Sequence, residues 1–413
     1  MTQLRLGRPI WLGRGTRPGA QTYHSLTGNQ AADVAIIGGG ITGAGVAFTF
    51  ASAGVRVALL EAALVGHGST GASTALVLRE PDLGRDLGRQ YGAAKAKRIW
   101  QLSAVAARDF VKTIRRLRIA CELTEQDSIY YTIEADNVPA LRAEYLRRCQ
   151  AGFDGEWLTP GALRQVTGIS GRAAIRTRGN ALFNPYAACV GLLRSAARAG
   201  AAIFERSRVQ RIDRVRDGVR LTTIRGTLTA QQVIIATGYA TPIFKPLVGR
   251  FQMNHTYVLA TSPIDKHQHR ELGLDRVMLW EMARPYHYAR WTSDHRLLLG
   301  GQDRPVVRGR GRAAAFRKGA RELRQYFEAL MPSLSDIGID YAWEGLFAMT
   351  PDGLPYIGPH KRYPRHLFAL GYGGNGMTFG FLAARLLLEQ WHGVHSPDHD
   401  LFGFGRDRWM RRI

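Results

Sequence analysis

The stretch from Asp33 to Glu61 constrains the fold more than any other part of this sequence. An apolar run, Val34–Ile37, is followed by a glycine-rich turn and by a helical segment that ends at Gly54. A second apolar run, Val55–Leu60, comes next. This order predicts a strand, a helix with Gly54 at its C-cap, and a second strand parallel to the first.

The glycine-rich turn has the sequence GGGITG and matches the pattern GxGxxG between a strand and a helix, where this motif requires it. Gly38 permits a tight turn, Gly40 lets the backbone approach a pyrophosphate, and Gly43 lets the helix pack close to the strand. The helix N-terminus at Ile41 and Thr42 supplies unpaired N–H groups and a partial positive charge. The alternative is a glycine-rich turn that binds nothing.

Glu61 ends the second strand, 23 positions after Gly38, and Ala62 follows it. A carboxylate here suits the 2′- and 3′-hydroxyls of an adenosine ribose and would repel a 2′-phosphate. We therefore predict that Glu61 and Ala62 contact a dinucleotide with an unphosphorylated ribose. This unit alone does not separate NAD from FAD.

A second glycine-rich loop, GYGGNG at 371–376, also follows an apolar run and opens a helix. No strand with an acidic end returns after it, so it is half of a dinucleotide site. Its backbone N–H groups suit the negative charge of a reduced flavin, which favours FAD over NAD. The alternative is a packing turn beneath a buried helix.

Composition sets further bounds. No run of 18 apolar residues appears, and the N-terminus lacks the apolar core of a secretory signal. The three cysteines, Cys121, Cys149 and Cys189, form no metal-ligand spacing, so we expect a cytoplasmic protein without a metal site. The net charge of +23 indicates either an anionic partner or a solvated surface, and the scattered arginines favour the solvated surface.

The remaining pattern predicts a mixed α/β fold of two interleaved domains. We expect an irregular lead-in at 1–31. A Rossmann-type FAD-binding domain, with a parallel sheet and a β-meander, is expected from 32–90, 185–245 and 344–413. A substrate domain with an antiparallel sheet is expected from 91–184 and 246–343. Helices are predicted at 91–118, 138–150, 185–200 and 312–331, and a hairpin turn at Thr292–Asp294.

Several motifs in order resemble the D-amino-acid oxidase, glycine oxidase and sarcosine oxidase superfamily of FAD enzymes over nearly the whole chain. Besides the two glycine loops they are GSTGAST (68–74), NPYAACVGLLRSAARAGAAIFERSRVQRI (184–212), VIIATG (233–238) and TPDGLPYIG (350–358). The resemblance implies further FAD contacts. They are Ser69 and Thr70 near the pyrophosphate and flavin, Val209 at the adenine, Thr237 and Gly238 beside the ADP moiety, and Gly373, Gly374, Asn375, Gly376, Met377 and Thr378 at the pyrimidine edge of the flavin.

The departures from that resemblance concern the substrate. Phe347 stands where amino-acid-oxidising relatives carry an arginine for the substrate carboxylate, and Leu298 where sarcosine oxidases carry an oxygen-activating lysine. No cysteine lies near the C-terminal loop, so FAD is expected to be non-covalent. The segment YARWTSDHRLLLGG more closely resembles the γ-glutamylputrescine oxidase branch.

The resemblance implies oxidation of a C–N bond in a primary or secondary amine or an amino or imino acid. Hydride passes to flavin N5, and the imine hydrolyses. The electron acceptor is oxygen or another molecule. Arg290 is the candidate carboxylate clamp, and Tyr257 and Tyr372 are candidates for an aromatic wall with hydroxyls. The alternatives are a surface arginine and core tyrosines.

Other activities stay open. A 2-hydroxy-acid dehydrogenase would need a base such as His255 or His287 in the pocket. A tRNA-modifying FAD enzyme would need a contiguous basic face, and the scattered arginines make nucleic acid an unlikely partner. A non-catalytic flavin-binding subunit is a further alternative, since one fold hosts many functions.

Overall fold

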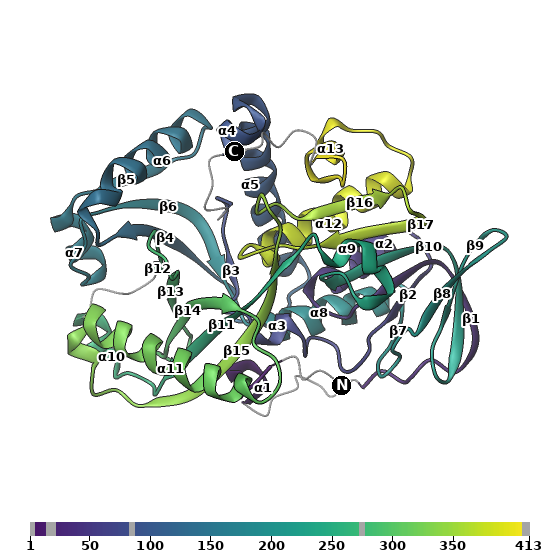
Figure 1. Ribbon diagram of the computed structural model, residues 1–413, viewed down its shortest axis with the longest axis horizontal. Coiled ribbons are helices and arrows are strands. Elements are labelled where there is room, and N and C mark those ends of the chain that lie inside the picture. Colours follow the sequence, from purple (N-terminus) through teal and green to yellow (C-terminus); the bar gives the residue numbers. More distant parts are fainter. Residues whose placement is uncertain (1–4, 14–21, 82–86, 272–276, 407–413) are drawn as a thin grey trace.

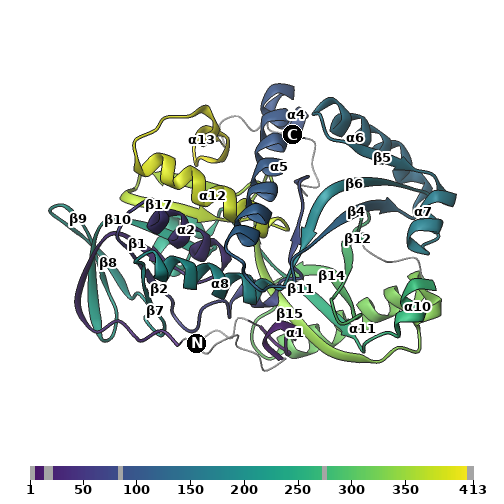
Figure 2. The same cartoon turned by 180° about the vertical axis from the view of Figure 1, so that it is seen from behind.

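The computed structural model describes residues 5–13, 22–81, 87–271 and 277–406. Two β-sheets stand at opposite ends of the long axis, and the long helix α5 (Ala93–Arg116) runs between them (Figures 1 and 2). The chain passes between the sheets several times, so both are built from segments far apart in sequence.

The first sheet is mostly parallel, in the order β16-β17-β10-β1-β2-β7, and the antiparallel strands β8 and β9 extend it from β10. Its strands are β1 Gly28–Ile37, β2 Val57–Leu60, β7 Ala202–Phe204, β8 Arg211–Val215, β9 Gly218–Thr222, β10 Gly226–Gly238, β16 Tyr356–His360 and β17 Tyr363–Leu370.

The second sheet is mostly antiparallel, in the order β15-β11-β14-β13-β12-β4-β6-β3, and β5 pairs with β6. Its strands are β3 Leu76–Val77, β4 Thr124–Thr132, β5 Gly155–Leu158, β6 Ala173–Leu182, β11 Gln252–Thr261, β12 Val277–Glu281, β13 His287–Trp291, β14 Leu297–Pro305 and β15 Ile339–Met349. Among the described residues of this sheet, only the pair of β12 with β4 is parallel.

Three helices cover one face of the first sheet, and α11 lies against the outer face of the second (Figures 1 and 2). The remaining helices are α1 Ile10–Gly13, α2 Ile41–Ser52, α3 Ser69–Ala72, α4 Leu87–Tyr91, α6 Val138–Gln150, α7 Pro160–Thr167, α8 Pro185–Arg198, α9 Lys245–Val248, α10 Lys266–Glu271, α11 Gly311–Leu330, α12 Gly376–Trp391 and α13 Pro397–Phe402. Short 3₁₀ turns are η1 Ala135–Asn137, η2 Pro242–Phe244 and η3 Pro332–Leu334. The three helices that cover one face of the first sheet are α2, α8 and α12.

Local sequence explains where these helices begin. Thr159 accepts a bond from the Ala162 amide at 3.3 Å, and Asn184 accepts one from the Ala187 amide at 3.1 Å. In both α7 and α8 a proline follows the capping residue, where its missing N–H costs nothing. The predicted helices at 138–150, 185–200 and 312–331 are confirmed to within about two residues.

The predicted mixed α/β fold is confirmed, with three corrections. The lead-in assigned to 1–31 is not wholly irregular, because it contains α1 and because β1 begins at Gly28. The first residues of β1 are exposed and pair with Gly226–Ala230 through backbone bonds and one side-chain bond, from Thr227 Oγ1 to Asn29 Oδ1 at 2.8 Å, so they carry no apolar signal. The run GTLTA, expected to belong to the antiparallel meander, and the run QQVIIATG, expected to be a separate apolar strand, form one strand, β10. The domain boundary predicted at 344 falls inside β15. Residues 1–4 and 14–21 of the predicted lead-in lie outside the described residues.

Within the described ranges, no helix combines the length and apolar character needed to cross a bilayer.

Candidate functional site

The first glycine loop joins β1 to α2 at the carboxyl edge of the parallel sheet. Gly38 has a φ of +111°, and its amide donates to the Leu60 carbonyl at 2.9 Å. A Cβ on Gly43 would lie 1.9 Å from the Gly38 carbonyl oxygen, and one on Gly38 would lie 2.6 Å from the Ala236 carbonyl oxygen. The loop therefore requires glycine at both positions, as the motif predicts.

The start of α2 presents amides that the helix itself cannot satisfy. The Ile41 amide donates to Thr70 Oγ1 at 2.9 Å, while those of Thr42 and Gly43 lie in the first turn, before the first intrahelical bond. A Cβ on Gly40 would meet only Thr70 Oγ1, at 3.1 Å, so the space beside this residue is otherwise open. Open space next to first-turn amides is the cradle that a pyrophosphate needs.

Glu61 lies half-buried at the end of β2 and is held in one orientation. Its Oε2 accepts from the Gly39 amide and its Oε1 from the Ala63 amide, both at 2.8 Å. Ala62 between them is exposed. The carboxylate thus stands directly beside the first loop, where the ribose of a bound dinucleotide is predicted.

The other predicted nucleotide contacts gather at the same edge. Val209 follows Ser207, whose amide donates to the Glu61 carbonyl at 2.8 Å. Thr237 and Gly238 end β10, which neighbours β1. Gly238 has a φ of +77°, and a Cβ there would meet nothing within 4 Å.

The second glycine loop reaches this edge from β17. The Gly371 amide donates to the Gly238 carbonyl at 2.9 Å, which ties the loop to the end of β10. Gly373 has a φ of +55°, and a Cβ there would meet only the Gly353 carbonyl oxygen, at 3.8 Å. Gly374 is exposed, and Gly376 begins α12. Two helix N-termini therefore lie at the carboxyl ends of β1 and β17, the two parallel strands on either side of β10, at the edge where such sheets bind their ligands.

Residues 375–378 link this loop to the second sheet. Asn375 Nδ2 donates to the Glu80 carbonyl at 3.2 Å, and Thr378 Oγ1 donates to the Leu78 carbonyl at 2.9 Å. Met377 is buried beside them. The segment that follows β3 is thus fixed against the start of α12.

The short helix α3 makes the matching link to β15. Ser69 Oγ donates to the Leu346 carbonyl at 2.7 Å, and Trp343 Nε1 donates to the Ala72 carbonyl at 2.8 Å. One face of the second sheet is therefore held against the loops of the first. The fold and this edge are those of a dinucleotide-binding enzyme, in which a second sheet is bonded to the loops at the carboxyl edge of the first.

Comparison with known proteins gives the class more closely. The chain matches the family described as DAO, FAD dependent oxidoreductase, over residues 33–390, and it belongs to that family. The FAD cofactor and the superfamily predicted from the motifs are confirmed, and the chain is an FAD-dependent oxidoreductase. Open glycine positions at Gly40, Gly238 and Gly373 are consistent with an extended FAD along this edge.

Among curated proteins, the chain is 26% identical to a glycine oxidase of Bacillus licheniformis, covering 86% of this chain and 92% of that protein. It is also 26% identical to the gamma-glutamylputrescine oxidoreductase of Escherichia coli, covering 89% and 85%. Because the chain is 26% identical to both proteins, sequence identity does not show whether it is nearer to the glycine oxidases or to the gamma-glutamylputrescine oxidoreductases. The crystal structure of glycine oxidase from Geobacillus kaustophilus shares the fold, with a TM-score of 0.77 at 22% identity over 93% of this chain and 99% of that one.

Arg290 is buried, and backbone carbonyls already accept hydrogen bonds from its guanidinium. It is 1% exposed, and its Nη1 donates to the carbonyls of Thr74 and Phe183, each at 2.9 Å. Its guanidinium also lies 5.2 Å from the centre of the Trp11 ring. These contacts hold separate segments together and favour a structural role over the predicted carboxylate clamp.

The two predicted tyrosines are also packed into cores. Tyr257 is 1% exposed and faces α11, where a Cβ on Gly319 would lie 2.5 Å from its ring. Tyr372 donates its hydroxyl to the Ala369 carbonyl at 2.7 Å. Burial raises the pKa of both hydroxyls, so both stay protonated at neutral pH. The structure favours the alternative of core packing for each.

The two histidines considered as bases lie on the outer face of the second sheet. His287 bonds through Nδ1 to Glu281, and its ring stacks on Tyr326 of α11 at 3.7 Å. His255 lies 3.8 Å from Glu344, and burial lowers its pKa. Neither histidine is on the face that contacts the FAD loops.

The face that contacts those loops carries aromatic residues that the sequence did not single out. Tyr130 and Trp280 are register partners on β4 and β12, and their rings stack at 3.9 Å. Tyr288 lies over Gly300, where a Cβ would be 2.2 Å from its ring, and its hydroxyl lies 3.3 Å from Thr256 Oγ1. The alternation of side chains along a strand indicates which residues share a face, but it does not show which of the two faces is the inner one.

Proposed function

We propose that this enzyme oxidises a C–N bond of a primary or secondary amine, or of an amino or imino acid, to an imine that water then hydrolyses. Bound FAD supplies the hydride acceptor. The observation that carries the proposal is that both glycine loops are tied to the second sheet: the second loop bonds to the segment after β3, and the helix α3, which bonds to the start of α2, also bonds to β15. The named relatives, a glycine oxidase and a gamma-glutamylputrescine oxidoreductase, support this substrate type.

The chain's own residues orient and enclose the substrate. Tyr130, Trp280 and Tyr288 line the inner face and exclude water, which strengthens polar contacts there. Oxidation of a neutral amine needs orientation and desolvation more than a strong base. The positions of His255 and His287 on the outer face fit this, because oxidation of a hydroxy acid would need a base beside the substrate.

Two further features belong to the proposal. Of the three cysteines, which are all free, Cys121 and Cys189 are buried, and Cys149 is exposed on α6. We infer that FAD is held without a covalent bond. Leu298 is fully buried at the position of the oxygen-activating lysine, so we expect slow reoxidation by oxygen.

The test is an anaerobic titration of the purified, FAD-loaded protein with a panel of amines, amino acids and 2-hydroxy acids. Loss of the flavin absorbance near 450 nm with an amine or amino acid is the expected result. Readmitting air then measures reoxidation. Bleaching by 2-hydroxy acids alone, or a protein that never takes up FAD, would overturn the proposal.

A further inference from the structure

The loop at 66–75 joins β2 of the first sheet to β3 of the second and borders the pyrophosphate cradle. Thr70 Oγ1 in this loop accepts from the Ile41 amide at 2.9 Å, and a Cβ on Gly40 would lie 3.1 Å from the same oxygen. Thr70 therefore forms one wall of the open space beside Gly40. A displacement of this loop would change the shape of the FAD site.

Three consecutive backbone carbonyls of this loop, at 72–74, each accept a bond from a side chain of a different segment. The bonds run from Trp343 Nε1 to Ala72 at 2.8 Å, from Trp11 Nε1 to Ser73 at 2.8 Å, and from Arg290 Nη1 to Thr74 at 2.9 Å. We call the three donor side chains the loop anchor. Trp11 and Arg290 also contact each other, because the guanidinium lies 5.2 Å from the centre of the indole ring.

The residue that follows these carbonyls needs their support. Ala75 has a φ of +58°, a conformation that a residue with a side chain seldom keeps unless its surroundings hold it. Its amide donates to Ser73 Oγ at 3.0 Å, and its carbonyl accepts from Arg290 Nη1 at 3.5 Å. The loop anchor therefore holds the loop in a conformation that its own sequence does not favour.

Trp11 reaches the loop because the N-terminal segment 5–13 is fixed along β15. The Arg8 amide donates to the Ala342 carbonyl at 3.2 Å, and a Cβ on Gly7 would lie 2.1 Å from the same carbonyl oxygen. The short helix α1 follows and turns Trp11 inward, where its side chain is 3% exposed. The segment that precedes the dinucleotide-binding unit in sequence thus contributes a buried donor to the cofactor loop.

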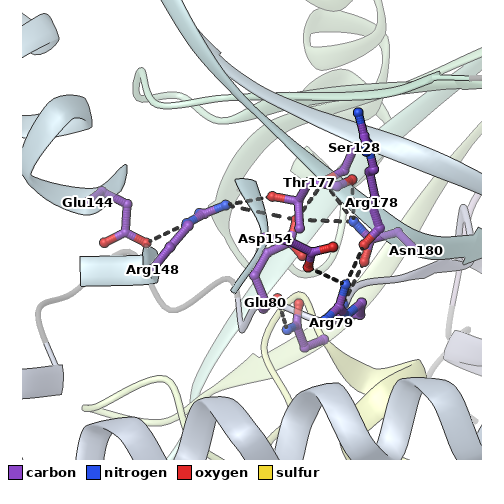
Figure 3. A network of polar contacts seen from close by, with 10 residues as sticks. Arg79, Glu80, Ser128, Glu144, Arg148, Asp154, Thr177, Arg178 and Asn180 are labelled. Atoms are coloured by element: carbon purple, nitrogen blue, oxygen red, sulfur yellow. Dashed lines mark hydrogen bonds and ion pairs between the residues drawn. The ribbon is translucent and has the colours of Figure 1, made fainter. Parts of the chain in front are cut away.

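The chain beyond the loop is held separately by the second sheet. The Arg79 amide donates to Asn180 Oδ1 at 2.7 Å, and Glu80 Oε1 accepts from Ser128 Oγ at 2.5 Å (Figure 3). These bonds to β4 and β6 do not involve the N-terminal segment. We therefore expect the loss of one donor of the loop anchor to act on the loop itself and to leave the second sheet in place.

We propose that Trp11 is a positioning residue for FAD. By holding the Ser73 carbonyl, it keeps the loop at 66–75, and with it Thr70, in the FAD-binding conformation before the cofactor arrives. A loop that is already ordered loses less conformational entropy when the cofactor binds, so the affinity for FAD is higher. This role concerns the binding of FAD and does not depend on which substrate the enzyme oxidises.

The test is Trp11→Phe in the full-length chain, which removes the indole N–H and keeps an aromatic ring. Apoprotein is reconstituted with FAD, and flavin fluorescence gives the Kd and the dissociation rate of the cofactor. The Kd for FAD should rise about tenfold, the effect of leaving one buried carbonyl without its partner, mainly through faster dissociation. Urea titration of the apoprotein measures its free energy of unfolding alongside.

Trp291→Phe is the matched control. Trp291 is also buried, but it lies on the outer face of the second sheet, with its ring 4.0 Å from that of His269. This variant should bind FAD with the wild-type Kd. Trp343→Phe removes the neighbouring donor of the loop anchor, so it should also raise the Kd for FAD, and it serves as the test if Trp11→Phe fails to fold.

The outcomes separate positioning from general stability. A wild-type Kd for FAD in Trp11→Phe, together with a lower free energy of unfolding, would make Trp11 a purely structural residue and overturn the proposal. An equal rise of the Kd in Trp291→Phe would also overturn it, since that variant leaves the loop anchor intact. If Trp11→Phe does not fold, a wild-type Kd in Trp343→Phe has the same meaning. Failure of every amine to bleach the flavin would overturn the proposed oxidation and leave this role of Trp11 standing.

Discussion

Replacing Gly43 with alanine is expected to displace the first glycine loop and weaken FAD binding. The new Cβ would lie 1.9 Å from the Gly38 carbonyl oxygen, a backbone atom that no rotamer change can move. Relief to the 3.0 Å at which real contacts begin requires a shift of about 1 Å. Overpacking of this kind costs about 1–3 kcal/mol in the free energy of unfolding.

The same shift moves the first-turn amides of α2 away from the pyrophosphate. Losing one hydrogen bond to a charged group, at about 1.5–3 kcal/mol, weakens FAD binding by about 10- to 150-fold. The assay is reconstitution of the apoprotein with FAD, followed by quenching of flavin fluorescence. Chemical denaturation of the same samples measures the free energy of unfolding.

Gly45→Ala is the matched control, two residues along the same helix. Its Cβ would meet only Phe381 Cδ2 at 3.9 Å, an ordinary contact. Alanine favours a helix over glycine by about 0.5–1 kcal/mol, so this variant should keep its FAD and gain slight stability. Wild-type FAD affinity in Gly43→Ala, or equal damage in Gly45→Ala, would refute the steric argument.

Other predictions concern buried charges. Arg406→Leu breaks a fully buried pair with Asp352, bonded at 2.7 Å, and should lower the free energy of unfolding by about 3–5 kcal/mol in urea titrations. Burial alone would raise the pKa of Asp352, but Arg406 outweighs it and holds that pKa below its usual value. The contribution of this pair to the free energy of unfolding should therefore be complete above about pH 4, the pKa of an aspartate in the unfolded chain, and should be lost as the pH falls through the lower pKa of the folded state. If the free energy of unfolding of Arg406→Leu falls with pH as steeply as that of wild type, this reasoning is wrong. Arg290→Met should lower the melting temperature without changing the Kd for glycine. If it instead weakens glycine binding and leaves the melting temperature unchanged, Arg290 binds the substrate carboxylate, as the sequence predicted.

The cofactor half of the molecule was predictable because its signals are local. Gly38, Gly40 and Gly43 are fixed by turn geometry within six residues, and the loop at 371–376 by the strand and helix around it. The start of β1 at Gly28 was not predictable, since its first residues are exposed and are held by backbone bonds to β10.

The substrate half was less predictable because β-strands alternate. Tyr257 and its neighbour Thr256 point to opposite faces of β11, and the sequence gives no sign that α11 covers the face with Tyr257. Arg290 does lie on the inner face, yet carbonyls from Thr74 and Phe183, far away in sequence, occupy its guanidinium. The buried position of Glu80 could not be predicted from the sequence, because its hydrogen-bond partners are distant in the chain, on β4, on β6 and at Asn375.

By itself, the sequence predicted a dinucleotide whose adenosine ribose carries no 2′-phosphate, and it favoured FAD, because steric limits on a glycine loop act between near neighbours. Tertiary structure alone decided which side chains face the substrate. The pairing of distant strands sets the inner face of a sheet, and only that pairing places Trp280 beside Tyr130.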